Sequence, residues 1–209
     1  MNTKNAMNLR SKSLLLLAAS LLIPAGLNAQ AAKNNSFGHQ EVDVAVTYTE
    51  QYSNLVSTPT FWHGGGSVEI SAQYYRGFGL AGNIAGTQTG NAASSGVGLS
   101  LVTATFGPRY TFYHPFGAEK KKSLAVFGQG LVGSAWGFDS YFPSSSGATR
   151  DASSLALQVG GGVDLGLKRH LGIRVFQADW LRTQLPNGTT NVQNTLRLGA
   201  GIVFRIPQR

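Results

Sequence analysis

The sequence predicts an all-β protein: an eight-stranded, antiparallel, up-and-down transmembrane β-barrel with a filled lumen. From residue 41 onward, apolar and polar residues alternate in short stretches, the pattern of strands whose two faces meet different surroundings. The polar positions within these stretches are mostly small, which suits the interior of a narrow barrel. Aromatic residues gather near the ends of the stretches, where membrane barrels have their interfacial girdles.

The composition fits one β domain and excludes several other classes. Among 209 residues there are 27 glycines and only 12% charged residues, unlike a disordered chain, which has low hydrophobicity and high net charge. The absence of cysteine excludes disulfides, thiolate zinc sites, cysteine nucleophiles and an N-terminal lipid anchor. The formal net charge of +8 does not predict nucleic-acid binding, because the bases gather in turns and form no stripe with interleaved aromatic residues.

Residues 1–31 have the pattern of a cleavable signal peptide, and residues 32–209 are then the barrel domain. Lys4, Arg10 and Lys12 form the positive region, and an apolar core at 14–23 follows them. That core is too short for a spanning helix, which needs roughly 20 apolar residues. The segment Ala29-Gln30-Ala31 fits the cleavage pattern after Ala31, and cleavage after Ala29 is left open.

Eight strands are predicted, and most have a clear apolar and a clear polar face. In the strand at 171–181, Phe176, Ala178 and Trp180 are expected to lie opposite Val175, Gln177 and Asp179. Pro108 suggests a bulge, and the facing of the strand at 124–135 is left open. The eight predicted strands occupy residues 41–49, 67–75, 78–86, 98–112, 124–135, 154–166, 171–181 and 195–204.

The connections between these strands mostly alternate in length, as the outer loops and inner turns of membrane barrels do. Residues 50–65, 87–97, 136–153 and 183–192 are long, residues 76–77 and 167–170 are short, and 113–123 is intermediate. If the first strand runs outward, one aromatic group lies at the outer ends: Tyr48, Tyr52, Trp62, Trp136, Phe138 and Trp180. The other lies at the inner ends: Tyr74, Phe78, Tyr110, Phe112, Tyr113, Phe116 and Phe204.

This aromatic arrangement favours a membrane barrel over a soluble barrel or sandwich, which strand alternation alone does not exclude. A barrel also requires the last strand to pair with residues 42–48 of the first. Bases collect at the inner turns, where they would either meet anionic head groups or serve solubility. These bases are Arg76, Lys120, Lys121, Lys122, Lys168 and Arg169.

The inward positions of the predicted strands collect opposite charges. Charges inside a narrow barrel are costly unless they are paired and hydrogen-bonded, so we expect an ion-pair network that fills the lumen. An ion path gated by the same pairs is the alternative. The predicted network contains Asp43, Glu69, Arg109, Asp164, Asp179 and Arg197, with Arg205 as a further candidate.

The sequence holds little that points to catalysis. We expect no catalytic residue, no cofactor and no metal site, because no phosphate-binding loop or metal-ligand spacing is present. The one enzymatic alternative is a lipid A-modifying barrel that uses His63, with Ser67 and Glu69 following it. The simpler interpretation of His63 is a loop histidine beside girdle aromatics.

Three segments resemble the outer-membrane β-barrel family that covers opacity-type proteins and the transmembrane domain of outer membrane protein A. They are Phe106-Gly107-Pro108-Arg109-Tyr110, residues 173–180 and residues 196–205. The order of Arg197, Gly199, Ile202 and Phe204 also resembles the C-terminal signal by which such barrels are recognised for insertion. The chain departs from the family pattern in that five residues follow Phe204 and no peptidoglycan-binding domain follows the barrel.

The resemblance implies a location in the outer membrane of a diderm bacterium and assembly by the barrel-insertion machinery. It implies outer-membrane lipids as surroundings, a monomer, no nucleic acid and no specific ligand. The expected role is structural or surface-interacting, through external loops. The first alternative is a small porin-like channel, and the second is the lipid A-modifying enzyme.

Overall fold

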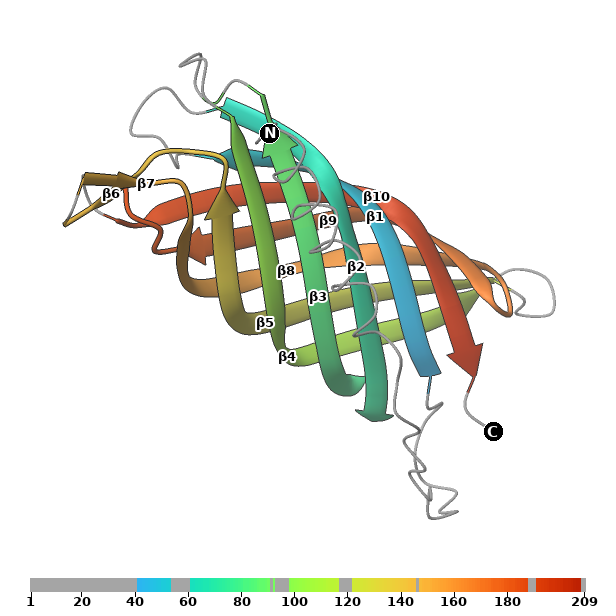
Figure 1. Ribbon diagram of the computed structural model, residues 1–209. Coiled ribbons are helices and arrows are strands. Elements are labelled where there is room, and N and C mark those ends of the chain that lie inside the picture. Colours follow the sequence, from blue (N-terminus) through green and yellow to red (C-terminus); the bar gives the residue numbers. More distant parts are fainter. Residues whose placement is uncertain are drawn as a thin grey trace, which may run out of the picture. The chain divides into compact units, whose positions relative to one another are not determined.

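The fold is a closed antiparallel β-barrel of eight strands, as the sequence predicts (Figure 1). A computed structural model describes residues 41–53, 61–90, 92, 98–116, 122–145, 147–187 and 191–207. The chain divides into the units Met1–Asn35 and Ser36–Arg209, and every described residue lies in the second. The barrel strands are β1 (Glu41–Ser53), β2 (Phe61–Tyr75), β3 (Phe78–Thr89), β4 (Leu99–Phe116), β5 (Lys122–Phe138), β8 (Ala152–Lys168), β9 (Leu171–Thr183) and β10 (Gln193–Pro207).

The barrel closes between its first and last strands. Around the wall the strands follow the order β1-β10-β9-β8-β5-β4-β3-β2. The predicted pairing is confirmed, because Val42 lies opposite Ile206 and Tyr48 opposite Ala200. A closed barrel leaves no strand edge unpaired, which is the condition for a sheet to cross a membrane. Among the described residues no helix is long and apolar enough to cross one.

The strands are longer than predicted, chiefly at the outer end. β1 continues to Ser53, β2 begins at Phe61 and β5 continues to Phe138, so the loops predicted at 50–65 and 136–153 are partly wrong. The predicted loop glycine Gly65 lies within β2, where a Cβ would lie 2.0 Å from the carbonyl oxygen of Gly86. Only glycine allows that approach of two strands, so this glycine belongs to the barrel wall.

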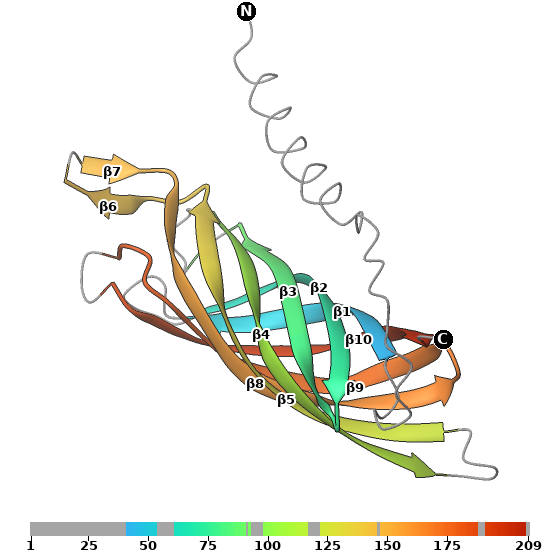
Figure 2. The same cartoon turned by 90° about the horizontal axis from the view of Figure 1, so that it is seen from below.

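Two short strands lie within the long connection between β5 and β8. β6 (Phe142–Ser144) and β7 (Gly147–Thr149) form a hairpin apart from the barrel sheet, and it projects past the barrel end in both views (Figures 1 and 2). At the opposite end, β2 and β3 are joined by the predicted tight turn of Arg76 and Gly77. Both turn residues have positive φ, 46° and 89°, which is the combination of a type I′ hairpin turn.

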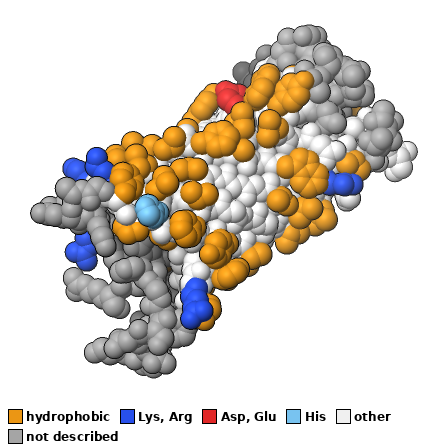
Figure 3. Space-filling view, turned by 180° about the vertical axis from the view of Figure 1, so that it is seen from behind, with side chains coloured by type: hydrophobic (Ala, Val, Ile, Leu, Met, Phe, Trp, Pro, Cys, Tyr) orange, Lys and Arg blue, Asp and Glu red, His pale blue; other side chains and the backbone are white. Residues whose placement is uncertain are grey.

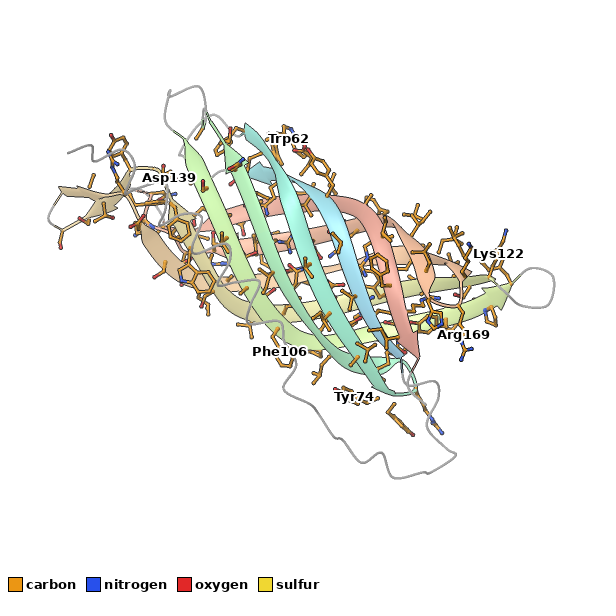
Figure 4. All side chains as sticks on the ribbon, turned by 45° about the vertical axis from the view of Figure 1, so that its right-hand side comes forward. Trp62, Tyr74, Phe106, Lys122, Asp139 and Arg169 are labelled. Carbon is orange, nitrogen blue, oxygen red and sulfur yellow. The ribbon has the colours of Figure 1, made fainter. Side chains whose placement is uncertain are left out.

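The outer wall of the barrel is apolar along the strands and aromatic towards their ends. In Figure 3 apolar side chains spread over the visible wall, and Lys and Arg side chains lie towards its ends. Trp62 lies near one end of the barrel and Tyr74 near the other, while Phe106 points out from the wall between the ends (Figure 4). Exposed aliphatic side chains on the wall include Val46, Ile70, Ile84, Val132, Leu155, Val159 and Ile202.

Most predicted facings are confirmed, and β5 is now assigned. Ala125, Phe127, Gln129 and Leu131 of β5 point into the lumen. Two expectations are wrong. Tyr113 is expected in the inner aromatic girdle, but its hydroxyl is hydrogen-bonded within the lumen. Pro108 makes no bulge: the β4–β5 pairing omits Gly107 and Pro108 but resumes in the same register, so the proline interrupts the pairing without shifting it.

The predicted facing of Val175 is also wrong, because β9 carries a bulge there. Near the start of β9, Phe176 pairs with Val163 of β8, but Arg174 pairs with Asp164, so one residue of β9 is extra. The pairing with β10 shifts at the same place. Val175 and Phe176 therefore both lie on the outer wall, 55% and 49% exposed, and Arg174 points into the lumen, 1% exposed.

Deleting Val175 tests this bulge. Because Val175 is the extra residue, its removal would leave Arg174 inside and Ile173 outside in a regular strand, and we predict that the barrel still folds. Deleting Val132, a wall residue of β5 in regular pairing, would turn part of that strand inside out and should prevent folding. The measurement is the difference in gel migration between unheated and boiled protein refolded in detergent. The bulge assignment would be contradicted if the protein without Val175 did not fold while the protein without Val132 did.

Candidate functional site: the charged lumen

Glu69 lies at the centre of a buried charge cluster that crosses the lumen. Its Oε1 is 2.6 Å from Nη1 of Arg109 on β4 and 2.7 Å from Nη1 of Arg174 on β9. Its Oε2 accepts a 2.8 Å hydrogen bond from the amide of Gln129 on β5. Because β2 neighbours none of β4, β5 and β9 in the barrel wall, these contacts cross the lumen and connect β2 to strands with which it does not pair.

Asp164 of β8 is the second carboxylate of this cluster. Arg174 donates to both of its oxygens, from Nε at 2.8 Å and from Nη2 at 3.0 Å, which is the paired geometry that suits a guanidinium and a carboxylate. Nη2 of Arg109 lies 3.6 Å from Asp164 Oδ2. Two carboxylates and two guanidiniums thus neutralise each other within one contact group.

The ring of Phe127 fills the space beside the two guanidiniums. The guanidinium carbon of Arg109 is 3.6 Å from the ring centroid, and that of Arg174 is 4.5 Å from it, so the ring face stabilises both cations. A Cβ on the facing Gly162 would lie 2.8 Å from the ring, so the ring occupies space that only glycine leaves. Cations, carboxylates and the aromatic ring together fill this level of the lumen.

A second group of contacts surrounds Arg197 of β10. Its Nη2 lies 3.4 Å from Oδ2 of Asp179 and donates to Oδ1 of Asn83 at 3.3 Å. The amide of Gln177 donates to the same Asp179 oxygen at 2.8 Å and accepts a 2.9 Å hydrogen bond from Arg174. Gln177 therefore connects the two charged groups into one network.

Asp43 and Arg205 form a third pair near the inner end. Nε of Arg205 lies 3.8 Å from Oδ1 of Asp43, and Nη1 of Arg205 donates to Ser123 Oγ at 2.7 Å. The hydroxyl of Tyr113 donates to Asp43 at 3.3 Å and accepts from the amide of Gln73 at 2.9 Å. Polar contacts therefore run from the inner end into the middle of the barrel.

The buried charges of the described barrel are balanced. Four carboxylates and four arginines are each at most 7% exposed. An uncompensated charge at any of these positions would be strongly destabilising, whereas paired charges with satisfied hydrogen bonds are tolerated. The balance makes the network an internal packing of the lumen. These residues are Asp43, Glu69, Asp164, Asp179, Arg109, Arg174, Arg197 and Arg205.

Part of the interior at the outer end is apolar, on the side of β4, β5, β8 and β9, which the sequence reasoning did not predict. Inward residues near the outer ends of four strands pack against Phe142 of the β6–β7 hairpin and Leu185 of the β9–β10 connection. This cluster packs across that side of the barrel end. Its buried members are Ala92, Leu99, Leu101, Ala135, Phe142, Ala156, Leu181 and Leu185.

The structure places all six residues of the predicted network in the lumen, and each takes part in an ion pair. Sequence reasoning missed Arg174, which contacts both central carboxylates. Strict alternation puts Arg174 on the lipid side, where a charge is costly. That conflict, together with the consecutive apolar pair Val175-Phe176, was the available signal for a bulge that turns Arg174 inward.

His63 is neither in a loop nor outside the barrel. It lies on β2 with 2% of its surface exposed, beside Phe61, whose ring centroid is 5.5 Å away. Ser67 lies four residues along the same strand, a separation of roughly 13 Å at 3.3 Å per residue. The Ser67 hydroxyl contacts Thr47 at 2.5 Å, and Glu69 is held by two arginines. These three residues therefore do not form a nucleophile, base and acid within hydrogen-bond reach.

Other predicted features divide between the described and undescribed parts of the chain. In β10, Arg197 and Gly199 face inward while Ile202 and Phe204 face the outer wall, and their role as an assembly signal stays a prediction. The signal peptide at 1–31 and the bases Lys120 and Lys121 lie outside the described residues. No group of metal-binding side chains occurs among the described residues.

Known structures share this fold at low sequence identity. Ail, the attachment invasion locus protein of Yersinia pestis, in complex with the heparin analogue sucrose octasulfate, matches with a TM-score of 0.52 and 18% identity over 81% of this chain and 100% of that chain. A second Ail structure matches over the same shares with a TM-score of 0.50 and 14% identity. Neisserial surface protein A matches with a TM-score of 0.48 and 12% identity over 79% of this chain and 96% of that one.

No protein-family model matches the sequence, and no curated protein is similar to it in sequence. The structural likeness therefore concerns the fold: a closed eight-stranded barrel of the outer-membrane type. The apolar wall with aromatic ends matches the lipid-facing surface of such barrels. The chain is thus a β-barrel membrane protein of the outer-membrane class.

Glu69→Gln tests the central cluster. The substitution leaves Arg109 and Arg174 with one carboxylate between them, so it buries an uncompensated positive charge. We predict a loss of about 3–5 kcal/mol in the free energy of unfolding. The measurement is urea unfolding from lipid vesicles, followed by tryptophan fluorescence. Asp139→Asn, at an exposed carboxylate, is the matched control and should change this free energy by less than about 0.5 kcal/mol. Equal effects of the two substitutions would contradict the cluster's importance.

Proposed function

We propose that the protein is a structural or surface-interaction barrel of the bacterial outer membrane that acts through its external end and has no open pore. It is then neither an enzyme nor a cofactor-binding protein. The observation that carries this proposal is the filled interior, in which a balanced charge network lies below an apolar cluster. A barrel closed in this way presents only its lipid-facing wall and its two ends to other molecules.

The position of the apolar cluster supports a role at the external end. The β6–β7 hairpin contributes Phe142 to the cluster, so this hairpin is tied to the barrel wall. Next to the cluster residue, Tyr141 is 64% exposed, and the hairpin residues 147–149 are also exposed. A fixed hairpin with an exposed aromatic side chain directly before it suits contact with another surface.

The ligand in the Ail complex gives no support for a sulfated-sugar ligand here. That complex holds a heparin analogue, which is a dense polyanion. At the outer end of this barrel, the described bases Arg150 and Arg182 are accompanied by Glu50, Asp139 and Asp151. Because these residues include no surplus of bases, we do not extend that ligand to this protein.

In this proposal the protein is a monomer that the barrel-insertion machinery assembles and that outer-membrane lipids surround. It does not bind nucleic acid. Closure within one chain leaves no strand edge that a second copy must cover. The last strand carries the residue order that resembles an insertion signal. A lipid A-modifying activity is not favoured, because His63 is buried and Ser67, the hydroxyl considered as its nucleophile, lies roughly 13 Å along the same strand.

Planar-bilayer recording tests the closed interior. We predict that the refolded protein shows no stable large conductance, because Arg109, Phe127 and the central carboxylates occupy the lumen. A stable large conductance would contradict the proposal. A small conductance whose ion selectivity changes in Glu69→Gln but not in Asp139→Asn would establish the small-channel alternative instead.

A further inference from the structure

Three exposed cations lie together at the inner end of the barrel. Lys122 begins β5, Lys168 ends β8, and Arg169 lies in the turn from β8 to β9. Because Ser123 of β5 pairs with Gly166 of β8, Lys122 and Lys168 lie on neighbouring strand ends. Lys122 and Arg169 lie near the same end of the barrel in Figure 4. We call Lys122, Lys168 and Arg169 the inner basic patch.

The inner basic patch has no acidic partner among the residues that the structure describes. None of its three side chains takes part in an ion pair there, and all three are exposed. The nearby carboxylates Asp43 and Asp164 are buried and paired with arginines inside the barrel. The positive charge of the patch is therefore directed to the outside.

The patch borders the lipid-facing wall. Directly before Lys168, Leu167 is 37% exposed, and Val126 of β5 and Ile173 of β9 are 45% and 42% exposed. A phospholipid could therefore place its acyl chains against this wall and its phosphate against the patch. Basic residues next to a membrane-spanning surface attract anionic head groups in this way.

The end of the barrel identifies the leaflet. The patch lies in and beside a short turn, at the end where Glu41 and Pro207 pair and where the Arg76-Gly77 turn joins β2 to β3. Short turns of outer-membrane barrels lie on the periplasmic side. The lipids that reach this end are therefore those of the inner leaflet.

We propose that the inner basic patch binds an anionic phospholipid of the inner leaflet and selects it over zwitterionic phospholipids. The inference rests on the membrane location in the proposed function and adds a specific lipid contact to it. The patch recognises the phosphate and its uncompensated negative charge, while the apolar wall accepts the acyl chains. Interaction with the periplasmic solvent alone would give no preference among lipids.

Lipid retention tests the proposal with the full-length barrel. The protein is refolded into vesicles of equal parts phosphatidylglycerol and phosphatidylethanolamine with identical acyl chains, and it is then extracted into mild detergent. Mass spectrometry compares the ratio of the two lipids on the protein with the bulk ratio. We expect phosphatidylglycerol to be enriched, by up to about fivefold for each contributing cation, and the enrichment to fall at high salt.

Two variants locate the effect. Lys122→Gln, Lys168→Gln and Arg169→Gln together should abolish the enrichment. Arg150→Gln with Arg182→Gln, which neutralises exposed arginines at the opposite end, should preserve it. Because all of these side chains are exposed, both variants should fold, and heat-dependent gel migration verifies this. The salt dependence of the wild-type enrichment provides a test that needs no variant.

Several outcomes would overturn the inference. The first is equal retention of the two lipids by the wild-type protein. The second is enrichment of phosphatidylglycerol that persists in the triple variant. The third is an equal loss of this enrichment in the variant that lacks Arg150 and Arg182. Displacement of phosphatidylglycerol from the patch by lipopolysaccharide would assign the contact to the other leaflet's lipid and would also overturn it. A barrel that inserts and is closed but shows no lipid preference fails this inference alone, whereas failure to insert refutes the proposed function.

Discussion

Glu69 holds two arginines inside a closed barrel, and the interior is arranged around that contact. A carboxylate removed from water is stable only if opposite charges and hydrogen-bond donors replace its hydration. Arg109, Arg174 and Gln129 supply them from three different strands. Each guanidinium then requires its own partners, and Asp164 meets that need for both arginines. The requirement for pairing thus extends from one residue to five strands of the wall.

Several irregular features of the strands follow from this packing. The bulge at Val175 lets Arg174 reach the lumen, and without it the charge would face lipid. Gly162 leaves room for the Phe127 ring that covers both guanidiniums. Gly160 leaves room for the Asp179 carboxylate, because a Cβ at position 160 would lie 2.1 Å from Asp179 Oδ1. Bulge and glycines are thus local adjustments to a crowded, charged interior.

The strand number, closure and most facings could be predicted because they depend on a period of two, which is visible in the residues themselves. The ends of the strands could not be predicted in this way. Gly65, for example, has the sequence pattern of a loop residue, and only its close contact with β3 shows that it belongs to a strand. Arg174 was missed because a bulge reverses the parity that the prediction assumed. The outer apolar cluster was missed for a different reason. Phe142 and Leu185 come from connections that have no periodic pattern, and only the tertiary structure brings them over the barrel end.

The central claim is that paired charges hold the lumen together, and a double-mutant cycle between Asp164 and Arg174 tests it most directly. Unfolding free energies are measured for the wild type, Asp164→Asn, Arg174→Gln and the double variant, by urea titration from vesicles. Because Arg174 donates to both Asp164 oxygens in a buried site, the account predicts a coupling energy of at least about 1 kcal/mol. Effects that simply add, with a coupling energy near zero, would contradict it.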